Sequence, residues 1–221
     1  MDEKAVLERV FGHSSSSDSE REEEEEVVGC DWEEIREVKG LWVSRSFLSP
    51  HQQSTLCSAI RSENWFTEPS NNQAMRFGDL PPWAIRLTHS IRDSVLLASD
   101  DDDRLPLPLD LLSRQPLFDQ MIVNMYQPGE GICAHVDLLR FEDGIAIVSL
   151  ESSCVMNFTS VDNELVSVPV LLNPGSLVVM SGEARYRWKH EINRRPGFQT
   201  WQGHELDQMR RTSVTLRKLC E

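Results

Sequence analysis

Residues 121–137 read MIVNMYQPGEGICAHVD. Two mainly apolar runs flank the turn-forming pair Pro128-Gly129, a pattern typical of two short strands. The second run ends in His135-Val136-Asp137. On an extended segment, residues two apart project to the same side, so this imidazole and this carboxylate can reach one ion. The stretch therefore predicts a β-rich fold with a candidate metal site at the end of a strand.

Short apolar runs of the same kind continue toward the end of the chain. Turn-forming residues such as Asp143-Gly144 and Asn173-Pro174-Gly175 separate them. Many short strands in succession favour an antiparallel sandwich or jelly roll. Residues 193–209 are expected to form a long irregular loop, which is often functional. The expected strands cover residues 121–126, 132–136, 145–150, 155–159, 165–172, 177–180 and 212–218, with a further short strand within 185–192.

Two helices are expected ahead of these strands. Ser49 as N-cap, Pro50 at the first helical position and Gln52 in a capping box start a helix that runs to about residue 63. A second helix is expected after Pro82, where apolar residues recur at helical spacing. Both should pack on one face of the larger sheet, so the predicted fold class is mainly β with flanking helices (α+β). The recurring apolar residues are Ala84, Leu87, Ile91 and Val95.

The N-terminal part of the chain has a different composition. Residues 14–26 read SSSSDSEREEEEE and contain no large apolar residue, which predicts disorder. We therefore expect an acidic, largely disordered tail over residues 1–36 and one domain over residues 37–221. The tail can solubilise the protein or bind a protein partner.

The charge of the chain constrains its partners and its location. The formal net charge is −14, which argues against nucleic-acid binding over the whole surface. Residues 185–218 are the exception, because they hold nine Lys and Arg against three acids. No apolar run approaches the roughly 20 residues that a membrane span needs. Five scattered cysteines without a CxxC pair favour reduced thiols, so the protein is expected to be intracellular and soluble, in the cytoplasm and/or nucleus.

A third ligand is needed to complete the candidate metal site. His190 is the candidate, since it alone among the other histidines follows a strand-like segment near the end of the expected barrel. Two His and one carboxylate on one face of an octahedron leave three positions open, as in non-haem Fe(II) oxygenases. A bidentate 2-oxo acid suits two of these positions and O2 the third. The structural alternative is that His135 is only a hydrogen-bonded strand histidine. The competing histidines are His13, His51, His89 and His204.

Distinctive short motifs surround these candidate ligands in a fixed order. Residues 124–131 (NMYQPGEG) precede His135, residues 175–186 (GSLVVMSGEARY) lead into His190, and residues 211–217 (RTSVTLR) follow. The series N-x-Y-x-P-G, H-x-D, G-E-x-R, H and R-x-S-x-T-x-R resembles the AlkB-like family of Fe(II)/2-oxoglutarate-dependent dioxygenases, over roughly residues 40–221. The resemblance implies a double-stranded β-helix that carries the metal in its mouth.

The resemblance also implies roles for individual residues. Arg211 matches the arginine that pairs with the distal carboxylate of 2-oxoglutarate, and Arg217 matches a second arginine near the metal-binding end of this cosubstrate. Ser213 stands where several members have Asn. The catalytic, metal-binding positions are His135, Asp137 and His190, and the cosubstrate-binding positions are Asn124, Tyr126, Arg211, Ser213 and Arg217.

The spacing of these residues agrees with such roles. Arg211, Ser213 and Arg217 are separated by even numbers of residues, so their side chains share one face of a strand, whereas Arg210 points away. A guanidinium can grip a carboxylate through two parallel hydrogen bonds, which Lys cannot reproduce.

The resemblance implies Fe(II), 2-oxoglutarate and O2 as cofactor and cosubstrates, and oxidative hydroxylation or demethylation of an alkylated base in RNA or DNA. Such a base must be unstacked or single-stranded, and the basic stretch 185–218 could hold its phosphates. Residues 71–83 are shorter than the Tyr- and Arg-rich lid expected of nucleic-acid-repairing relatives. A hydroxylase of a protein side chain or small molecule is therefore the alternative, and a non-catalytic binding module a more remote one.

Overall fold

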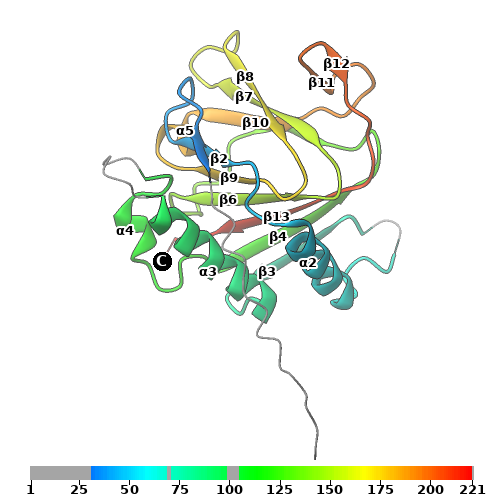
Figure 1. Ribbon diagram of the computed structural model, residues 1–221. Coiled ribbons are helices and arrows are strands. Elements are labelled where there is room, and N and C mark those ends of the chain that lie inside the picture. Colours follow the sequence, from blue (N-terminus) through cyan, green and yellow to red (C-terminus); the bar gives the residue numbers. More distant parts are fainter. Residues whose placement is uncertain (1–30, 69–70, 99–104, 221) are drawn as a thin grey trace, which may run out of the picture.

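The computed structural model describes residues 31–68, 71–98 and 105–220, and its strands form two antiparallel sheets that pack face to face (Figure 1). This jelly-roll arrangement confirms the predicted fold class. The major sheet has the order β1-β2-β9-β6-β13-β4-β3, and the minor sheet has the order β5-β10-β7-β8. The strands of the major sheet are β1 (Trp32–Glu34), β2 (Leu41–Ser44), β9 (Leu177–Met180), β6 (Ile145–Leu150), β13 (Arg211–Arg217), β4 (Gln120–Tyr126) and β3 (Gln73–Phe77). Those of the minor sheet are β5 (Ile132–His135), β10 (Trp188–Ile192), β7 (Cys154–Ser160) and β8 (Ser167–Leu172).

Two longer helices, α2 (Pro50–Ser62) and α3 (Pro82–Leu97), cover the outer face of the major sheet (Figure 1). Helix α2 starts at the predicted capping box, in which the Gln52 amide donates to the Ser49 hydroxyl at 3.3 Å and the Ser49 amide donates to the Gln52 side chain at 2.8 Å. Two single-turn helices follow, α4 (Leu109–Leu112) and α5 (Glu183–Tyr186). None of the helices in the described ranges is long and apolar enough to cross a membrane.

The two faces of the major sheet serve two separate apolar cores. In β9, Leu177 and Val179 pack with the helices, whereas Val178 and Met180 face the minor sheet. In β13, Val214 and Leu216 also pack with the helices. Because side chains alternate along a strand, the residues at positions 211, 213, 215 and 217 project between the two sheets. The candidate site therefore lies inside the jelly roll.

Several elements differ from the sequence-based expectations. The further strand expected within 185–192 is the single turn α5 followed by β10, and the loop 193–209 contains a two-residue hairpin of β11 (Thr200–Trp201) and β12 (His204–Glu205). Strands β1 and β3 were not expected. Both lie at edges of the major sheet, where pairing with a neighbour stabilises segments whose own composition is only weakly strand-like.

Strand β1 lies on the tail side of the boundary predicted between residues 36 and 37. It pairs with β2, where Trp32 lies opposite Ser44, and the Trp32 indole donates to the Ser94 hydroxyl of α3 at 3.1 Å. This anchoring explains why three residues of an acidic segment join the sheet. The predicted disorder of residues 14–26, and any partner bound there, lie outside the described residues.

Candidate metal centre

The pairing of β5 with β10 brings two histidines together. His135, the last residue of β5, lies directly opposite His190 of β10, and the ring centroids are 4.3 Å apart. Gly131 allows the approach of the two segments, because a Cβ at this position would lie 1.9 Å from the carbonyl oxygen of Ile192. Only glycine tolerates backbone contact this close. Gly131, just before β5, thus lets β5 and β10 approach closely enough for His135 and His190 to lie opposite each other.

Asp137 follows two residues after β5 and completes a cluster with these histidines. One potential ligand atom from each of the three residues lies within 4.8 Å of the other two, and Asp137 Oδ2 lies 3.6 Å from His190 Nε2. Two imidazoles and one carboxylate form the donor set of a facial metal site. The other predicted candidates lie elsewhere: His51 on α2, His89 on α3 and His204 on β12, with His13 outside the described residues.

The hydrogen bond of His135 and the lowered pKa of His190 both suit metal binding. His135 Nδ1 donates to the carbonyl of Cys133 at 2.8 Å, because a carbonyl can only accept. This contact leaves the lone pair of Nε2 free for a metal. Burial lowers the pKa of His190 to about 4, the neighbouring His135 acts in the same direction, and Asp137 opposes them. His190 is therefore neutral at neutral pH, the form that binds metals.

A buried arginine of the major sheet holds the Asp137 carboxylate. Arg217 forms an ion pair with Asp137 Oδ1, and its Nε donates to the Gln120 side-chain oxygen at 2.7 Å. Its guanidinium also lies 4.0 Å from the centroid of the Phe141 ring. Burial lowers the pKa of Arg217, and Asp137 opposes that shift. The ion pair ties β13 to the loop after β5 and leaves Oδ2 directed at the histidine side.

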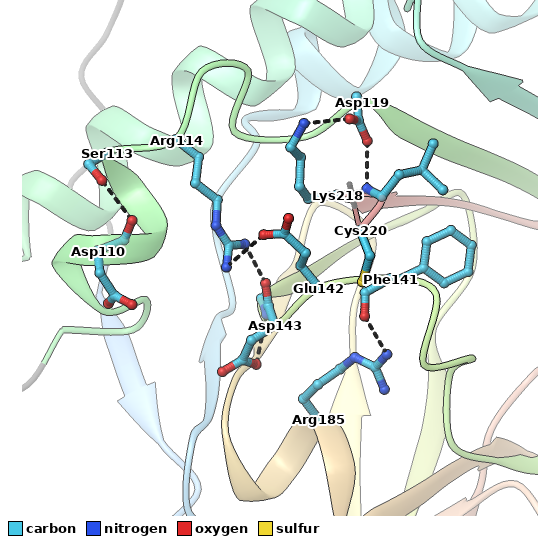
Figure 2. A network of polar contacts seen from close by, with 12 residues as sticks. Asp110, Ser113, Arg114, Asp119, Phe141, Glu142, Asp143, Arg185, Lys218 and Cys220 are labelled. Carbon is cyan, nitrogen blue, oxygen red and sulfur yellow. Dashed lines mark hydrogen bonds and ion pairs between the residues drawn. The ribbon is translucent and has the colours of Figure 1, made fainter.

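A second buried arginine, Arg185, fixes the loop that follows Asp137. Arg185 is 2 % exposed and donates to the backbone carbonyls of Asp137 at 3.0 Å, Leu138 at 2.8 Å and Phe141 at 3.1 Å. Figure 2 shows its guanidinium directed at the Phe141 carbonyl, with Arg114 pairing with Glu142 further along the loop. Through these three hydrogen bonds, Arg185 holds the backbone of the segment that carries Asp137.

Arg211 occupies the same inner face of the major sheet. It lies opposite Tyr126 in the register of β13 and β4, and its Nε donates to the Ser149 hydroxyl at 3.2 Å. Both terminal nitrogens are buried without a hydrogen-bond partner among the described residues. Unpaired buried donors are costly, and two parallel N–H groups match a carboxylate. The residues present thus fit a carboxylate-bearing cosubstrate.

The remaining predicted cosubstrate positions surround Arg211. Ser213 lies opposite Asn124 in the sheet, and the Asn124 side-chain oxygen accepts a hydrogen bond from Gln73 of β3 at 2.7 Å. Burial raises the pKa of Tyr126, while Arg211 and a hydrogen bond with Ser213 oppose that rise. Tyr126 therefore stays a neutral phenol. The structure brings all five predicted positions to one face of the major sheet, and Arg217 at one end of this face contacts Asp137 of the metal-ligand cluster.

The basic stretch 185–218 does not form the free positive surface that its composition predicted. Distant acids, which a local charge count cannot reveal, neutralise most of its exposed bases. Within the described ranges, Arg195 is the one exposed base of this stretch without an ion pair. Arg185, Arg194, Arg211 and Arg217 are buried. The ion pairs are Arg187–Asp162 at 2.6 Å, Lys189–Glu164 at 2.6 Å, Arg210–Glu151 at 2.5 Å and Lys218–Asp119 at 2.6 Å.

The fold resembles those of solved oxygenase structures. The structure of OsALKBH1 superposes with a TM-score of 0.58 at 12 % identity, covering 85 % of this chain and all of that one. A Pseudomonas putida prolyl-4-hydroxylase superposes with a TM-score of 0.51 at 15 % identity, covering 82 % of this chain and 94 % of that one. These likenesses concern the fold alone.

Sequence comparisons give closer relatives. The tRNA (carboxymethyluridine(34)-5-O)-methyltransferase alkbh8 of Xenopus tropicalis is 32 % identical over 171 residues, which cover 71 % of this chain and 25 % of that protein. The alkylated DNA repair protein ALKBH8 homolog of Arabidopsis thaliana is 26 % identical over 224 residues, covering 82 % of this chain and 59 % of that protein. The chain thus spans about a quarter of the frog relative.

The family model of the 2OG-Fe(II) oxygenase superfamily matches residues 76–217. This range contains the metal-ligand cluster and the arginines of β13, together with most of both sheets. Members of the family are oxidoreductases that use Fe(II), 2-oxoglutarate and O2. The chain belongs to the 2OG-Fe(II) oxygenase superfamily, as an AlkB-like member.

Proposed function

We propose that the chain binds Fe(II) through His135, Asp137 and His190 and acts as a 2-oxoglutarate-dependent oxygenase. One observation carries this proposal: Arg217 ties the cluster of two histidines and one carboxylate to the strand face that also carries Arg211, a buried arginine whose two terminal nitrogens lack a partner among the described residues. A metal site alone would fit many proteins. The combination with a buried guanidinium that lacks an anionic partner among the described residues fits a metal that is bound together with an anionic cosubstrate. The proposed cosubstrate contacts are Asn124, Tyr126, Arg211, Ser213 and Arg217.

The residues of the chain bind and orient the reactants. Arg211 would grip the distal carboxylate of 2-oxoglutarate through two parallel hydrogen bonds, with the neutral Tyr126 phenol beside it. Arg217 holds Asp137 so that one carboxylate oxygen remains for the metal. The apolar residues between the sheets exclude water from this region. Bound Fe(II), 2-oxoglutarate and O2 supply the oxidising chemistry that hydroxylates a C–H bond of the substrate.

As substrate we propose an alkylated or otherwise modified base in RNA or DNA. The named activities of the frog and Arabidopsis relatives, on tRNA and alkylated DNA, support this class. The rim of the site supports it as well. Gln73 contacts Asn124, so Met75 and Phe77 of β3 share the site-facing side, where they are 40 % and 47 % exposed. An exposed aromatic ring beside the site can stack on an unstacked base.

A second candidate substrate is a protein side chain or a small molecule. The neutralised basic stretch favours it, because phosphate binding normally relies on unpaired Lys and Arg. The net charge of −14 acts in the same direction by repelling nucleic acid at long range. This candidate uses the same metal and cosubstrate residues and differs only at the mouth of the site.

Succinate formation from 2-oxoglutarate tests the proposal. The protein is incubated in air with Fe(II) and ascorbate, with and without total tRNA, and compared with the double variant His135→Ala/Asp137→Ala. We expect succinate from the wild type alone, stimulated by tRNA, with a mass change in one nucleoside. Succinate formation that neither RNA nor DNA stimulates would favour the second candidate substrate class. No succinate from the wild type, with no charge-transfer band on anaerobic addition of Fe(II) and 2-oxoglutarate, would refute the assignment of the site.

A further inference from the structure

Arg194 is a buried residue near Tyr126 and Arg211 to which the proposed function gives no role. Its side chain is 1 % exposed, although it lies just after β10 in the basic stretch. Nη1 donates to the carbonyl of Gln127 at 3.2 Å, and Nη2 donates to the carbonyl of Met209 at 2.6 Å. These two hydrogen bonds join segments that are 82 residues apart in the sequence. The side chain therefore acts as a bridge between them.

The bridge lies at the end of the ladder that carries the cosubstrate residues. Gln127 directly follows Tyr126, the last residue of β4, and Met209 precedes Arg211, the first residue of β13, by two positions. Tyr126 and Arg211 are themselves the last pair in this register. Beyond this pair the two strands have ended, and a direct hydrogen bond joins the segments that follow, from the Gly129 amide to the Gln208 side chain at 3.1 Å. The guanidinium of Arg194 adds two more hydrogen bonds closer to the pair and limits how far Tyr126 and Arg211 can separate.

Arg194 also brings a second positive charge close to Arg211. Burial lowers the pKa of Arg194, and the charge of Arg211 lowers it further. No ion pair joins a carboxylate to either arginine within the described part of the chain. The Cys154 thiol and the Glu130 carboxylate oppose the lowering of the Arg194 pKa. Burial raises the pKa of the Cys154 thiol, which favours its uncharged form, and Glu130 is exposed and accepts a hydrogen bond from the Gln127 amide at 2.8 Å.

Two buried cations without a buried anion are an unfavourable arrangement in the free protein. The Nε group of Arg194 increases this energetic cost, because the nitrogen is buried without a hydrogen-bond partner among the described residues. A ligand that brings a carboxylate to this end of the pocket relieves the repulsion. A ligand of the same shape without that carboxylate does not. The arrangement thus discriminates between dicarboxylates and monocarboxylates.

We propose that Arg194 is a positioning residue that sets the selectivity of the pocket for a dicarboxylate cosubstrate, by holding the Tyr126–Arg211 pair in place and by adding a second positive charge. This inference rests on the proposed function, since it concerns the same cosubstrate. It gives Arg194 a role inside the protein, where the local composition had predicted a role at the surface.

Binding of two ligands to the full chain tests this inference. One ligand is 2-oxoglutarate, and the other is 2-oxopentanoate, which has the same five-carbon chain without the distal carboxylate. Both are titrated by calorimetry into protein loaded with Mn(II), which avoids turnover. The variants are Arg194→Met, which removes the charge and the bridge, and Arg194→Lys, which keeps the charge but lacks the planar fork. Arg195→Met is the matched control, because Arg195 is the exposed neighbour.

We expect Arg194→Met to weaken 2-oxoglutarate binding about ten-fold or more, as the loss of a charge near a carboxylate does, and to change 2-oxopentanoate binding less than about two-fold. Arg194→Lys should fall between the wild type and Arg194→Met, and Arg195→Met should match the wild type. Equal losses for both ligands would mean a merely structural role and overturn the inference, as would unchanged 2-oxoglutarate binding. If Arg194→Met does not fold, the same comparison is made with Arg194→Lys. A wild type that binds neither ligand would refute the proposed function itself.

Discussion

Arg211 lies directly opposite Tyr126 in the sheet, with its guanidinium carbon 5.6 Å from the centroid of the phenol ring. The pair forms one end of the proposed cosubstrate pocket, and the arginine supplies the only side-chain charge of the two. If Arg211 binds a carboxylate, Arg211→Met should weaken 2-oxoglutarate binding about 100-fold, since two charge-assisted hydrogen bonds of roughly 1.5–3 kcal/mol each are lost and partly replaced by water. Calorimetric titration of the Mn(II)-loaded protein measures this loss.

Arg210→Met is the matched control for that experiment. Arg210 is the residue immediately before β13, and its side chain pairs with Glu151 at 2.5 Å on the side of the sheet where Thr212 also contacts Glu151, away from Arg211. Its removal should leave 2-oxoglutarate binding unchanged. Equal losses in the two variants would show that the strand, rather than the pocket, had been damaged.

Asp137→Asn should abolish tight metal binding. The amide has no charge for the metal and also leaves the Arg217 guanidinium buried without an anion. We expect the affinity for Mn(II) to fall by a factor of about 100 or more, measured by equilibrium dialysis at a temperature well below unfolding. Asp162→Asn, which alters an exposed carboxylate paired with Arg187, serves as the comparison. Wild-type Mn(II) affinity in Asp137→Asn would remove Asp137 from the ligand set.

Arg185→Met should destabilise the metal-free protein markedly. Three backbone carbonyls in the loop after β5 lose their donor at once, and buried acceptors without partners are costly. We expect the free energy of unfolding in urea to fall by about 3 kcal/mol or more. Arg187→Met removes a nearby exposed arginine and should change it by less than about 1 kcal/mol. A loss in Arg185→Met no larger than in Arg187→Met would contradict the supporting role of Arg185.

The stability of the metal-free protein should depend on pH through His190. Its pKa in the folded state is lowered from 6.5 to about 4, so between these values the unfolded chain binds more protons than the folded protein. Stability therefore rises with pH across this window and is lost as pH falls from about 6.5 toward 4. Urea unfolding of protein treated with a chelator, at several pH values, measures the slope. His190→Gln should flatten this slope relative to the wild type, and an unchanged slope would assign the dependence to other groups.

Much of the site follows from simple alternation in the sequence. His135 and Asp137, like Arg211 and Ser213, are two residues apart, and the strand pattern alone put each pair on one face. The central strands are apolar enough to be recognised without a partner, and the fold class was confirmed. The roles of the eight site residues remain predictions, although the structure brings their side chains together.

The features that were not predicted from the sequence depend on long-range contacts. Trp188, His190 and Ile192 are buried at alternate positions, and continuing this period by two residues reaches Arg194. That signal was present, but the high local charge favoured a surface role. Strand β3 reads QAMRF and lacks the alternation of apolar and polar residues by which a strand is recognised, and its pairing with β4 stabilises it. The neutralisation of the basic stretch depends on acids such as Asp119, which lies 99 residues from Lys218.

Strand β13 occupies the middle of the major sheet, between β6 and β4, yet it is synthesised after both of them. Until it inserts, β6 and β4 each present an unpaired edge, and such edges promote aggregation. The protein is therefore most vulnerable during synthesis, before residues 211–217 have left the ribosome. A premature stop ahead of Arg211 would remove the arginines of the pocket and also leave an open sheet, so we expect the truncated product to aggregate or be degraded instead of persisting as a folded, inactive protein.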